Sequence, residues 1–148
     1  MTFKKKKKVL ILYTSKSGNT ESFVDWFEDT FSSQLDIDSE NLYRSKKSIN
    51  FEQYDKIILG TYTWNDGKIP VEMKKVLIEK REVLQERTEF LFGSGITIYP
   101  FFCGALDGAQ IILGQSYPLF KFELTFIPSE HLEEIEQIKE IIKNDFIK

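Results

Sequence analysis

Short runs of apolar residues alternate along the chain with segments in which apolar residues recur every three or four positions. Residues 8–13 form a mostly apolar run between charged and polar residues, which is typical of a parallel strand buried on both faces. Residues 57–61 and 90–93 repeat this pattern. Residues 120–126 alternate strictly between apolar and polar side chains, which predicts a strand with one solvated face. Residues 37–43 form a weaker extended segment.

Helical spacing fills the stretches between these strands. The segments that show it are residues 20–34, 70–87, 100–114 and 129–147. In the last one, a single apolar stripe lies opposite Glu and Lys side chains, and its members are Leu132, Ile135, Ile138, Ile142 and Phe146. At residues 50–53, where the alternating order calls for another helix, we expect only a short polar connection. The alternating order of strands and helices predicts a three-layer α/β/α sandwich around a parallel sheet.

Composition limits the chemistry that the chain can perform alone. Its 148 residues include one His, His131, and one Cys, Cys103. This excludes a multi-histidine metal site, a cysteine cluster and an intramolecular disulfide, and we expect a reducing, cytoplasmic setting. We expect His131 to be a surface residue and Cys103 a buried one, neither with a role in chemistry. The chemistry then has to come from carboxylates, hydroxyls, backbone amides or a bound cofactor.

The net charge of −3 conceals an acidic body, because five positive charges belong to residues 4–8 and the rest carries −8. Nucleic-acid surfaces need basic residues spread over a face or groove, so this balance argues against nucleic acid as a partner. A lysine run at a chain end is typical of a solvated tail, and residues 9–13 are too short for a signal peptide. No stretch approaches a membrane span. We expect a basic tail at residues 1–8 and a single domain at residues 9–148.

A hydroxyl-rich loop follows the first predicted strand. Residues 14–21 combine four hydroxyls with Gly18, directly before a predicted helix. Free backbone amides at a helix N-terminus bind anions, so this loop predicts a phosphate site. It lacks the spacing of a nucleoside-triphosphatase loop and the three-glycine dinucleotide motif, and its hydroxyls suit a terminal monophosphate. The alternative is an ordinary helix cap in a hydroxyl-rich turn.

Two further loops follow strands that end at the same edge of a parallel sheet, which is where ligands bind in such folds. Residues 61–70 hold Trp64 among polar and turn-forming residues. Residues 93–107 begin with closely spaced glycines, which would let backbone amides approach a planar ligand, and they also hold Tyr99. A phosphate loop, a loop Trp and a loop Tyr at one edge favour a ligand site over simple packing of either ring.

With these three motifs in order and at fitting spacing, the chain resembles a short-chain flavodoxin from residue 9 to about residue 124. Residues 15–20 match the loop that binds the phosphate of flavin mononucleotide (FMN) in that family. Residues 63–67 match its first isoalloxazine loop, and residues 93–107 match its second. The resemblance implies an FMN-containing one-electron carrier with a five-stranded parallel, flavodoxin-like sheet in the strand order 2-1-3-4-5.

The resemblance also implies the residues that contact FMN and the partners of the carrier. Trp64 would cover one face of the flavin and Tyr99 the other. The implied cofactor contacts are Thr14, Ser15, Lys16, Ser17, Gly18, Asn19, Thr20, Thr61, Tyr62, Thr63, Trp64, Asn65, Asp66, Gly67, Ser94, Gly95, Ile96, Tyr99, Phe102 and Cys103. The donor would be an NADPH-dependent flavodoxin or ferredoxin reductase, and the acceptors would be redox enzymes. We expect an electron-transfer protein without catalytic residues, monomeric as transient contacts require.

Three residues depart from the family pattern. Asn65 stands where flavodoxins usually have the Gly whose peptide turns over on flavin reduction. That turn needs a positive φ, which costs a non-Gly residue about 1–2 kcal/mol, so we expect a first reduction potential lower by about 45–90 mV. Ile96 replaces a frequent acidic residue, and Lys68 adds a positive charge. We therefore expect a second potential less negative than in strongly acidic flavodoxins.

Other functions fit the same sequence less well. The FMN protein that activates the dimanganese class Ib ribonucleotide reductase is similar around residues 17–24 and 121–124. Such activators tend to have a Gly-rich first flavin loop, however, whereas Trp64 resembles the carriers. A flavodoxin-like scaffold that has lost flavin would explain Asn65 and Ile96 but not the intact phosphate loop. A reductase acting directly on NAD(P)H or quinone is disfavoured, because a flavin covered on both faces leaves no room for hydride transfer.

Overall fold

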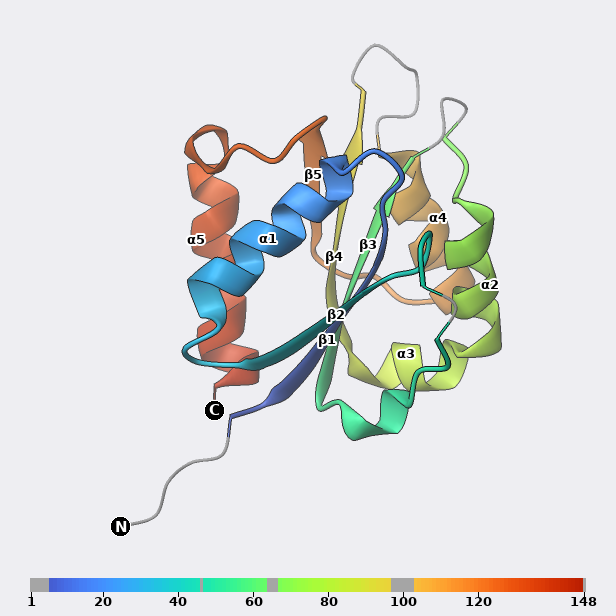
Figure 1. Cartoon of the computed structure of the whole chain (residues 1–148), viewed down its shortest axis with the longest axis horizontal. Coiled ribbons are helices and arrows are strands. Elements are labelled where there is room, and N and C mark those ends of the chain that lie inside the picture. The colour runs from blue at the N-terminus through green and yellow to red at the C-terminus, as the bar shows by residue number, and fades with distance from the viewer. Residues whose placement is uncertain (1–5, 46, 64–66, 97–102, 148) are drawn as a thin grey trace.

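The computed structural model describes residues 6–45, 47–63, 67–96 and 103–147. Its centre is a five-stranded sheet in the order β2-β1-β3-β4-β5 (Figure 1). The strands are β1 (Lys8–Thr14), β2 (Asp36–Asn41), β3 (Lys56–Tyr62), β4 (Thr88–Gly95) and β5 (Leu119–Glu123). Every neighbouring pair is parallel. The parallel sheet and the implied strand order are both confirmed.

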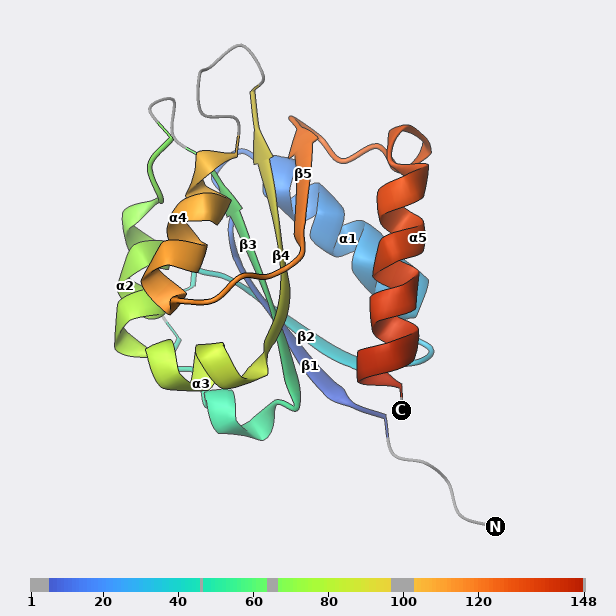
Figure 2. The same cartoon turned by 180° about the vertical axis from the view of Figure 1, so that it is seen from behind.

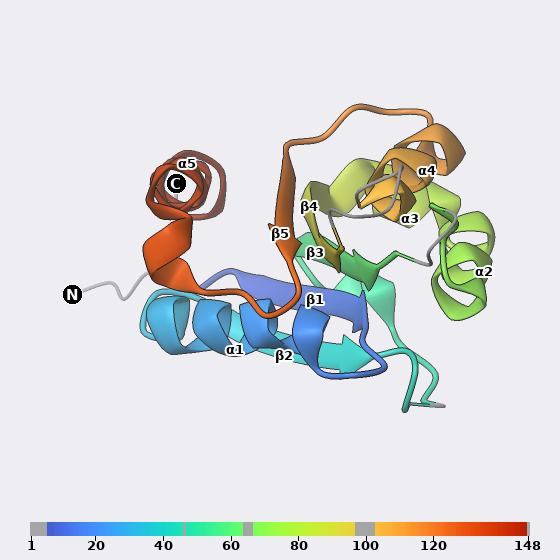
Figure 3. The ribbon, with the colours of Figure 1, turned by 90° about the horizontal axis from the view of Figure 1, so that it is seen from above.

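Helices cover both faces of the sheet. On one face lie α1 (Asn19–Phe31) and α5 (Leu132–Ile141), which continues as the π-helical turn η3 (Ile142–Phe146) (Figure 1). On the other lie α2 (Val71–Glu79), α3 (Arg81–Arg87) and α4 (Gly104–Leu113) (Figures 2 and 3). The predicted three-layer sandwich is confirmed. Among the helices of the described ranges, none is long and apolar enough to cross a membrane.

The strands are apolar on both sides because each side meets a helical layer. Along β1, Val9 and Ile11 join the core under α1 and α5, whereas Leu10 and Leu12 join the core under α2, α3 and α4. Gly60 on β3 makes room for a ring, since a Cβ there would lie 2.1 Å from the side chain of Phe92. The continuous apolar runs in the sequence therefore correspond to strands that are buried on both faces.

The predicted helix over residues 70–87 is wrong, because the structure has two helices there. Lys80 lies between α2 and α3 with φ −114° and ψ 26°, outside the helical region. The apolar spacing continues across this break, and no Gly or Pro marks it. The shortened connection predicted at residues 50–53 is confirmed as a 3₁₀ turn, η1 (Phe51–Gln53).

β2 and β5 end earlier than their patterns predict. β2 stops at Asn41, after which residues 42–44 form a turn. β5 stops at Glu123, because Leu124 adopts a left-handed conformation with φ 54°. The alternation up to residue 126 continues because Phe126 is buried against the α1 side of the core, outside the strand.

The last helix begins later than predicted. Pro128 opens a 3₁₀ turn, η2 (Pro128–Glu130), so α5 starts at Leu132. Leu132 is 66% exposed, and the buried stripe begins at Ile135. His131, predicted to be a surface residue, is only partly exposed. Its side chain is 18% exposed, and its ring stacks on Phe126 with centroids 5.3 Å apart, because the segment after β5 folds back beside it.

Candidate functional site

The carboxyl ends of β1, β3 and β4 lie at one edge of the sheet, at the top of Figure 1. A cavity of about 180 Å³ lies between them. It is lined by Lys16, Ser17, Asn19, Tyr62, Thr63, Ser94, Gly95, Ile96 and Leu124. All of these except Leu124 belong to the contacts predicted from the sequence, so the structure brings the described parts of the three predicted loops together.

Two larger hollows lie at other places. One, of about 610 Å³, is lined by Glu52 and by residues of α2 and α3 at the opposite end of the sheet. The other, of about 670 Å³, runs beside β2 and the end of α1. Ligands of open parallel sheets bind outside the carboxyl ends of the strands. We therefore assign the candidate site to the smaller cavity.

The loop between β1 and α1, residues 15–18, is organised by Ser15. The Ser15 Oγ accepts hydrogen bonds from the backbone N–H groups of Gly18 (3.1 Å) and Glu21 (3.4 Å). Gly18 precedes α1 with φ 92°, a left-handed conformation that glycine adopts without strain. Other N–H groups of this loop and of the first turn of α1 have no acceptor within the described part of the chain. We call them the free amides, and they belong to Lys16, Ser17, Asn19 and Thr20.

The hydroxyls of this loop mostly bond to the protein. The Thr14 Oγ1 donates to the Glu72 Oε1 over 2.5 Å. The Thr20 Oγ1 lies 2.9 Å from the Ser94 Oγ, and both residues are buried. Ser17 is exposed. The predicted phosphate site therefore offers mainly backbone amides, with the hydroxyls serving to fasten the loop to β4 and α2.

Carboxylates beside this loop are held by hydroxyl donors. The Tyr13 hydroxyl donates to the Glu21 Oε1 (2.9 Å), and burial, followed by this bond, raises the pKa of Tyr13. The Glu72 Oε1 accepts from Thr14 and also from the Tyr62 hydroxyl, over 3.4 Å. Glu72 on α2 thus joins the end of β1 to the end of β3.

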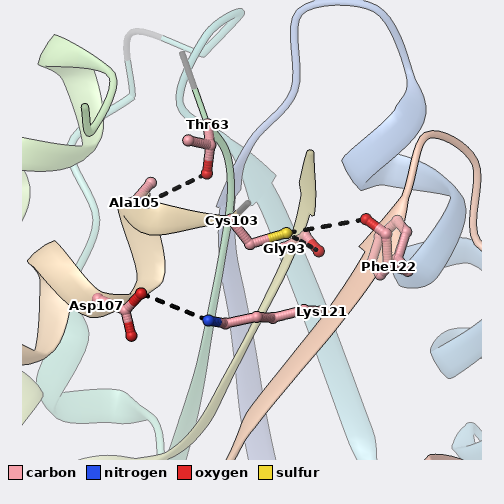
Figure 4. A network of polar contacts seen from close by, with 7 residues as sticks. All are labelled: Thr63, Gly93, Cys103, Ala105, Asp107, Lys121 and Phe122. Carbon is pink, nitrogen blue, oxygen red and sulfur yellow. Dashed lines mark hydrogen bonds and ion pairs between the residues drawn. The ribbon is translucent and has the colours of Figure 1, made fainter. Parts of the chain in front are cut away.

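The end of β3 is also tied to α4 (Figure 4). The Thr63 Oγ1 accepts a hydrogen bond from the Ala105 N–H over 3.2 Å, which caps the first turn of α4. Thr61 is buried, and its Oγ1 donates to the carbonyl of Tyr62 over 2.8 Å. Gly67 has φ 83°. The predicted contacts at Trp64, Asn65 and Asp66 lie outside the described residues.

The end of β4 contributes Ser94, Gly95 and Ile96 to the cavity. Cys103, which precedes α4, is fully buried, as predicted. Its thiol faces the carbonyls of Gly93 (3.6 Å) and Phe122 (3.9 Å) (Figure 4), and burial raises its pKa to about 12. The predicted contacts at Tyr99 and Phe102 lie outside the described residues.

Sequence reasoning missed the contacts by which three residues shape the site. Leu124 lines the cavity, and its N–H bonds to the carbonyl of Gly95 over 3.1 Å. Asn41 bonds to the backbone of Ser15, and Glu72 bonds to Thr14. A polar residue at the end of an edge strand was the only signal for Asn41. Leu124 gave none, because the strand pattern continues through it.

The sequence itself identifies the family to which this fold belongs. The family model for flavodoxins matches residues 11–115, which include all three loops. The chain belongs to the flavodoxin family. It is 38% identical over 102 residues to probable flavodoxin 2 of Bacillus subtilis, a match that covers 68% of each chain. The resemblance inferred from the loop motifs is confirmed.

Solved flavodoxins share this fold along nearly their whole length. The crystal structure of oxidised flavodoxin 2 from Bacillus cereus is 30% identical, with a TM-score of 0.71, over 94% of this chain and 99% of that one. A flavodoxin from Fusobacterium nucleatum, solved bound to flavin mononucleotide, is 20% identical, with a TM-score of 0.67, over 95% and 99% of the two chains. The latter similarity is one of fold alone.

Proposed function

We propose that this flavodoxin-family chain binds FMN at the carboxyl edge of its sheet and carries one electron at a time between redox proteins. The observation that carries the proposal is the set of free amides beside the cavity. A phosphate supplies the acceptor oxygens that these N–H groups lack, and the positive end of α1 favours its charge. Family membership and the FMN bound to the Fusobacterium nucleatum relative support the same ligand.

The residues of the cavity fit the rest of such a ligand. Next to the free amides, the walls combine polar Thr63 and Ser94 with apolar Ile96 and Leu124. Mixed walls of this kind suit a ribityl chain that leads from a phosphate to an aromatic ring. We further propose that the ring lies between Trp64 and Tyr99, as the family resemblance implies.

When bound, the flavin supplies the one-electron chemistry. The chain's own residues hold and orient it. The Thr20–Ser94 contact fastens the phosphate loop to β4, and Glu72 fastens the end of β1 to Tyr62. Because these bonds form within the protein, the phosphate loop and the strand ends that it contacts are held in place before the ligand arrives, which lowers the entropy cost of binding.

We propose an NADPH-dependent flavodoxin or ferredoxin reductase as the donor and redox enzymes as acceptors. The protein would then act as a monomeric carrier in the cytoplasm, in keeping with the buried free thiol of Cys103. Transient exchange of this kind uses small interfaces that leave the partners free to separate.

Titration of the flavin-free protein with FMN, followed by quenching of flavin fluorescence, tests the ligand. We expect a submicromolar dissociation constant, since about −9 kcal/mol is reasonable for a ligand of this size. Replacing the exposed Ser17 by Ala should weaken FMN binding by roughly tenfold to a hundredfold, because hydrogen bonds to charged groups contribute about 1.5–3 kcal/mol. The matched control is Ser33→Ala, at an exposed serine remote from the site. If flavin fluorescence is not quenched at high micromolar protein, the chain does not bind FMN, and the alternative of a scaffold that has lost flavin would be favoured.

Anaerobic stepwise reduction of the FMN-loaded protein tests the function. Two one-electron steps at well-separated potentials would support the carrier. Closely spaced steps would favour the activator of class Ib ribonucleotide reductase. In the carrier, Asn65→Gly should raise the first potential by about 45–90 mV, because glycine adopts positive φ without the strain that asparagine incurs.

A further inference from the structure

Asn41, the last residue of β2, lies beside the first residue of the phosphate loop. It is 9% exposed. Its carboxamide makes a reciprocal pair of bonds to one residue: the Ser15 N–H donates to the Asn41 Oδ1 (2.9 Å), and the Asn41 Nδ2 donates to the Ser15 carbonyl (3.0 Å). The Tyr43 N–H also donates to the Oδ1, over 3.2 Å. Among the described residues, every hydrogen bond of this carboxamide is thus made to a backbone group.

This pair of bonds takes the place of a backbone hydrogen-bond pair that would extend the β1–β2 ladder to Ser15. The ladder between β1 and β2 ends at the pair Tyr13 and Asn41. The Leu42 N–H still donates to the carbonyl of Tyr13 over 2.7 Å. The chain then forms a turn, in which the next backbone bonds are made to the carbonyl of Asn41. A side-chain amide has the same donor and acceptor as a peptide group. Asn41 therefore supplies to Ser15 the pairing that the backbone of β2 no longer supplies.

The position of Ser15 in turn decides the shape of the loop. Its Oγ accepts the N–H groups of Gly18 and Glu21, and the free amides of Lys16 and Ser17 lie between Ser15 and Gly18 in the chain. When the Ser15 backbone is held in place, the first residue of the loop is held with it. The bonds to the Ser15 Oγ then also hold Gly18 and the start of α1 in place. In the described residues, the hydrogen bonds of the Ser15 backbone and Oγ reach Asn41, Gly18 and Glu21.

We propose that Asn41 is a positioning residue that aligns the free amides and thereby makes the site prefer phosphorylated flavin over unphosphorylated flavin. This proposal rests on the proposed function. Asn41 does not touch the flavin, and its effect passes through the backbone and hydroxyl of Ser15. It therefore acts on the phosphate end of the ligand and leaves the ring end unchanged.

Dissociation constants for FMN and for riboflavin, measured by flavin fluorescence on the same proteins, test the proposal. Asn41→Ala removes both bonds to Ser15, and Asn41→Asp keeps the acceptor but sets a carboxylate oxygen against the Ser15 carbonyl. Both variants should bind FMN at least about tenfold more weakly, equal to about 1.4 kcal/mol, with the riboflavin constant unchanged. The matched control is Asn144→Asp, at an exposed position in η3, which should behave as the unmodified chain.

Several outcomes would overturn the proposal. Equal weakening of FMN and riboflavin would mean that Asn41 only stabilises the fold. Weakening by Asn41→Asp but not by Asn41→Ala would mean that the added charge, and not the lost pairing, acts on the phosphate. An unmodified chain that binds neither flavin would overturn the proposed function, and the inference with it.

Amide hydrogen exchange in the flavin-free protein examines the positioning step without any ligand. The Gly18 and Glu21 N–H groups bond to the Ser15 Oγ, so Asn41→Ala should speed their exchange, while amides within the sheet and in the last turns of α1 keep their protection. Unchanged protection at Gly18 and Glu21 would contradict the inference even if the variant bound FMN more weakly.

Discussion

The two faces of the sheet hold their helices in different ways. Beneath α1 and α5 the core is rich in aromatic rings, and Phe23 of α1 stacks on Phe92 of β4 with centroids 4.2 Å apart. Phe126, from the segment after β5, packs edge-on against Phe23 at 5.0 Å. Beneath α2, α3 and α4 the core is mainly leucine. Rings therefore join α1, which follows the loop at residues 15–18, to two other segments at once.

On the leucine-rich face, polar side chains tie the helix ends together. The Arg81 Nε donates to the carbonyl of Ile112 (2.9 Å), and the Gln85 Nε2 donates to that of Leu113 (2.6 Å). Thr63 caps the other end of α4 through the N–H of Ala105. The terminal groups of a helix have no partner within the helix, so these bonds supply one. Packing of rings fixes one layer, and capping of helix ends adds to packing in the other.

The two faces should differ most in the stability that is lost when the central ring, that of Phe23, is truncated. Phe23→Ala should lower the free energy of unfolding by about 3–5 kcal/mol, because it empties a fully buried site and loses ring contacts to β4 and to Phe126. Leu77→Ala, at an equally buried position of α2, should cost less, about 2–3 kcal/mol. Urea unfolding followed by circular dichroism measures both values. A larger loss for Leu77→Ala would show that the leucine-rich face, and not the aromatic one, contributes more to stability.

A pH-dependent loss of stability should come from the leucine-rich face. Burial raises the pKa of Cys103 from 9.0 to about 12. The thiol in the unfolded chain therefore ionises first, and stability that is complete below pH 9 falls as the pH rises toward 12. Between pH 8 and pH 10 the loss should be about 1 kcal/mol by this linkage.

Comparison with Cys103→Ser isolates this effect from the titration of tyrosine and lysine side chains, since serine does not ionise in this range. The difference in unfolding free energy between the two proteins should change with pH, and a difference that stays constant would show that the thiol is not the responsible group.

Much of the fold could be predicted because the residues that determine its central strands and its first loop are close together in the sequence. β1, β3 and β4 each bury both faces, which requires a continuous apolar run. The loop at residues 15–18 combines hydroxyls and Gly18 directly before a helix, and cap chemistry depends on adjacent residues. For the same reason, the predicted loops supplied nearly all of the residues that line the cavity.

The remaining features depend on partners far apart in the chain. Asn41 and Ser15 are 26 positions apart, Thr14 and Glu72 are 58 apart, and the partners Thr20 and Ser94 are 74 apart. No spacing in a single sequence marks such pairs. The left-handed turn at Leu124 was missed for a related reason, since its N–H is held by the carbonyl of Gly95 and not by its neighbours.

The cap at the N-terminal end of α4 should have a measurable but smaller effect. Thr63→Val keeps the shape of the side chain and removes the acceptor for the Ala105 N–H, so it should cost about 1 kcal/mol of stability. Thr63→Ser is the matched variant because it retains the hydroxyl, and it should cost less. Hydrogen exchange at Ala105 should accelerate in the valine variant only. Equal exchange in both variants would show that the cap is dispensable.

The smallest effect should lie at the other end of α4. Gln85→Ala removes the bond to the Leu113 carbonyl, which is a terminal carbonyl of the helix. Because Gln85 is only half-buried, water reaches part of the vacated position, and the loss should be about 0.5–1 kcal/mol. The control is Gln137→Ala, at an exposed position of α5, which should leave stability unchanged. If Gln85→Ala unfolds at the same urea concentration as the unmodified chain, the bond from Gln85 to the Leu113 carbonyl contributes nothing measurable to this face.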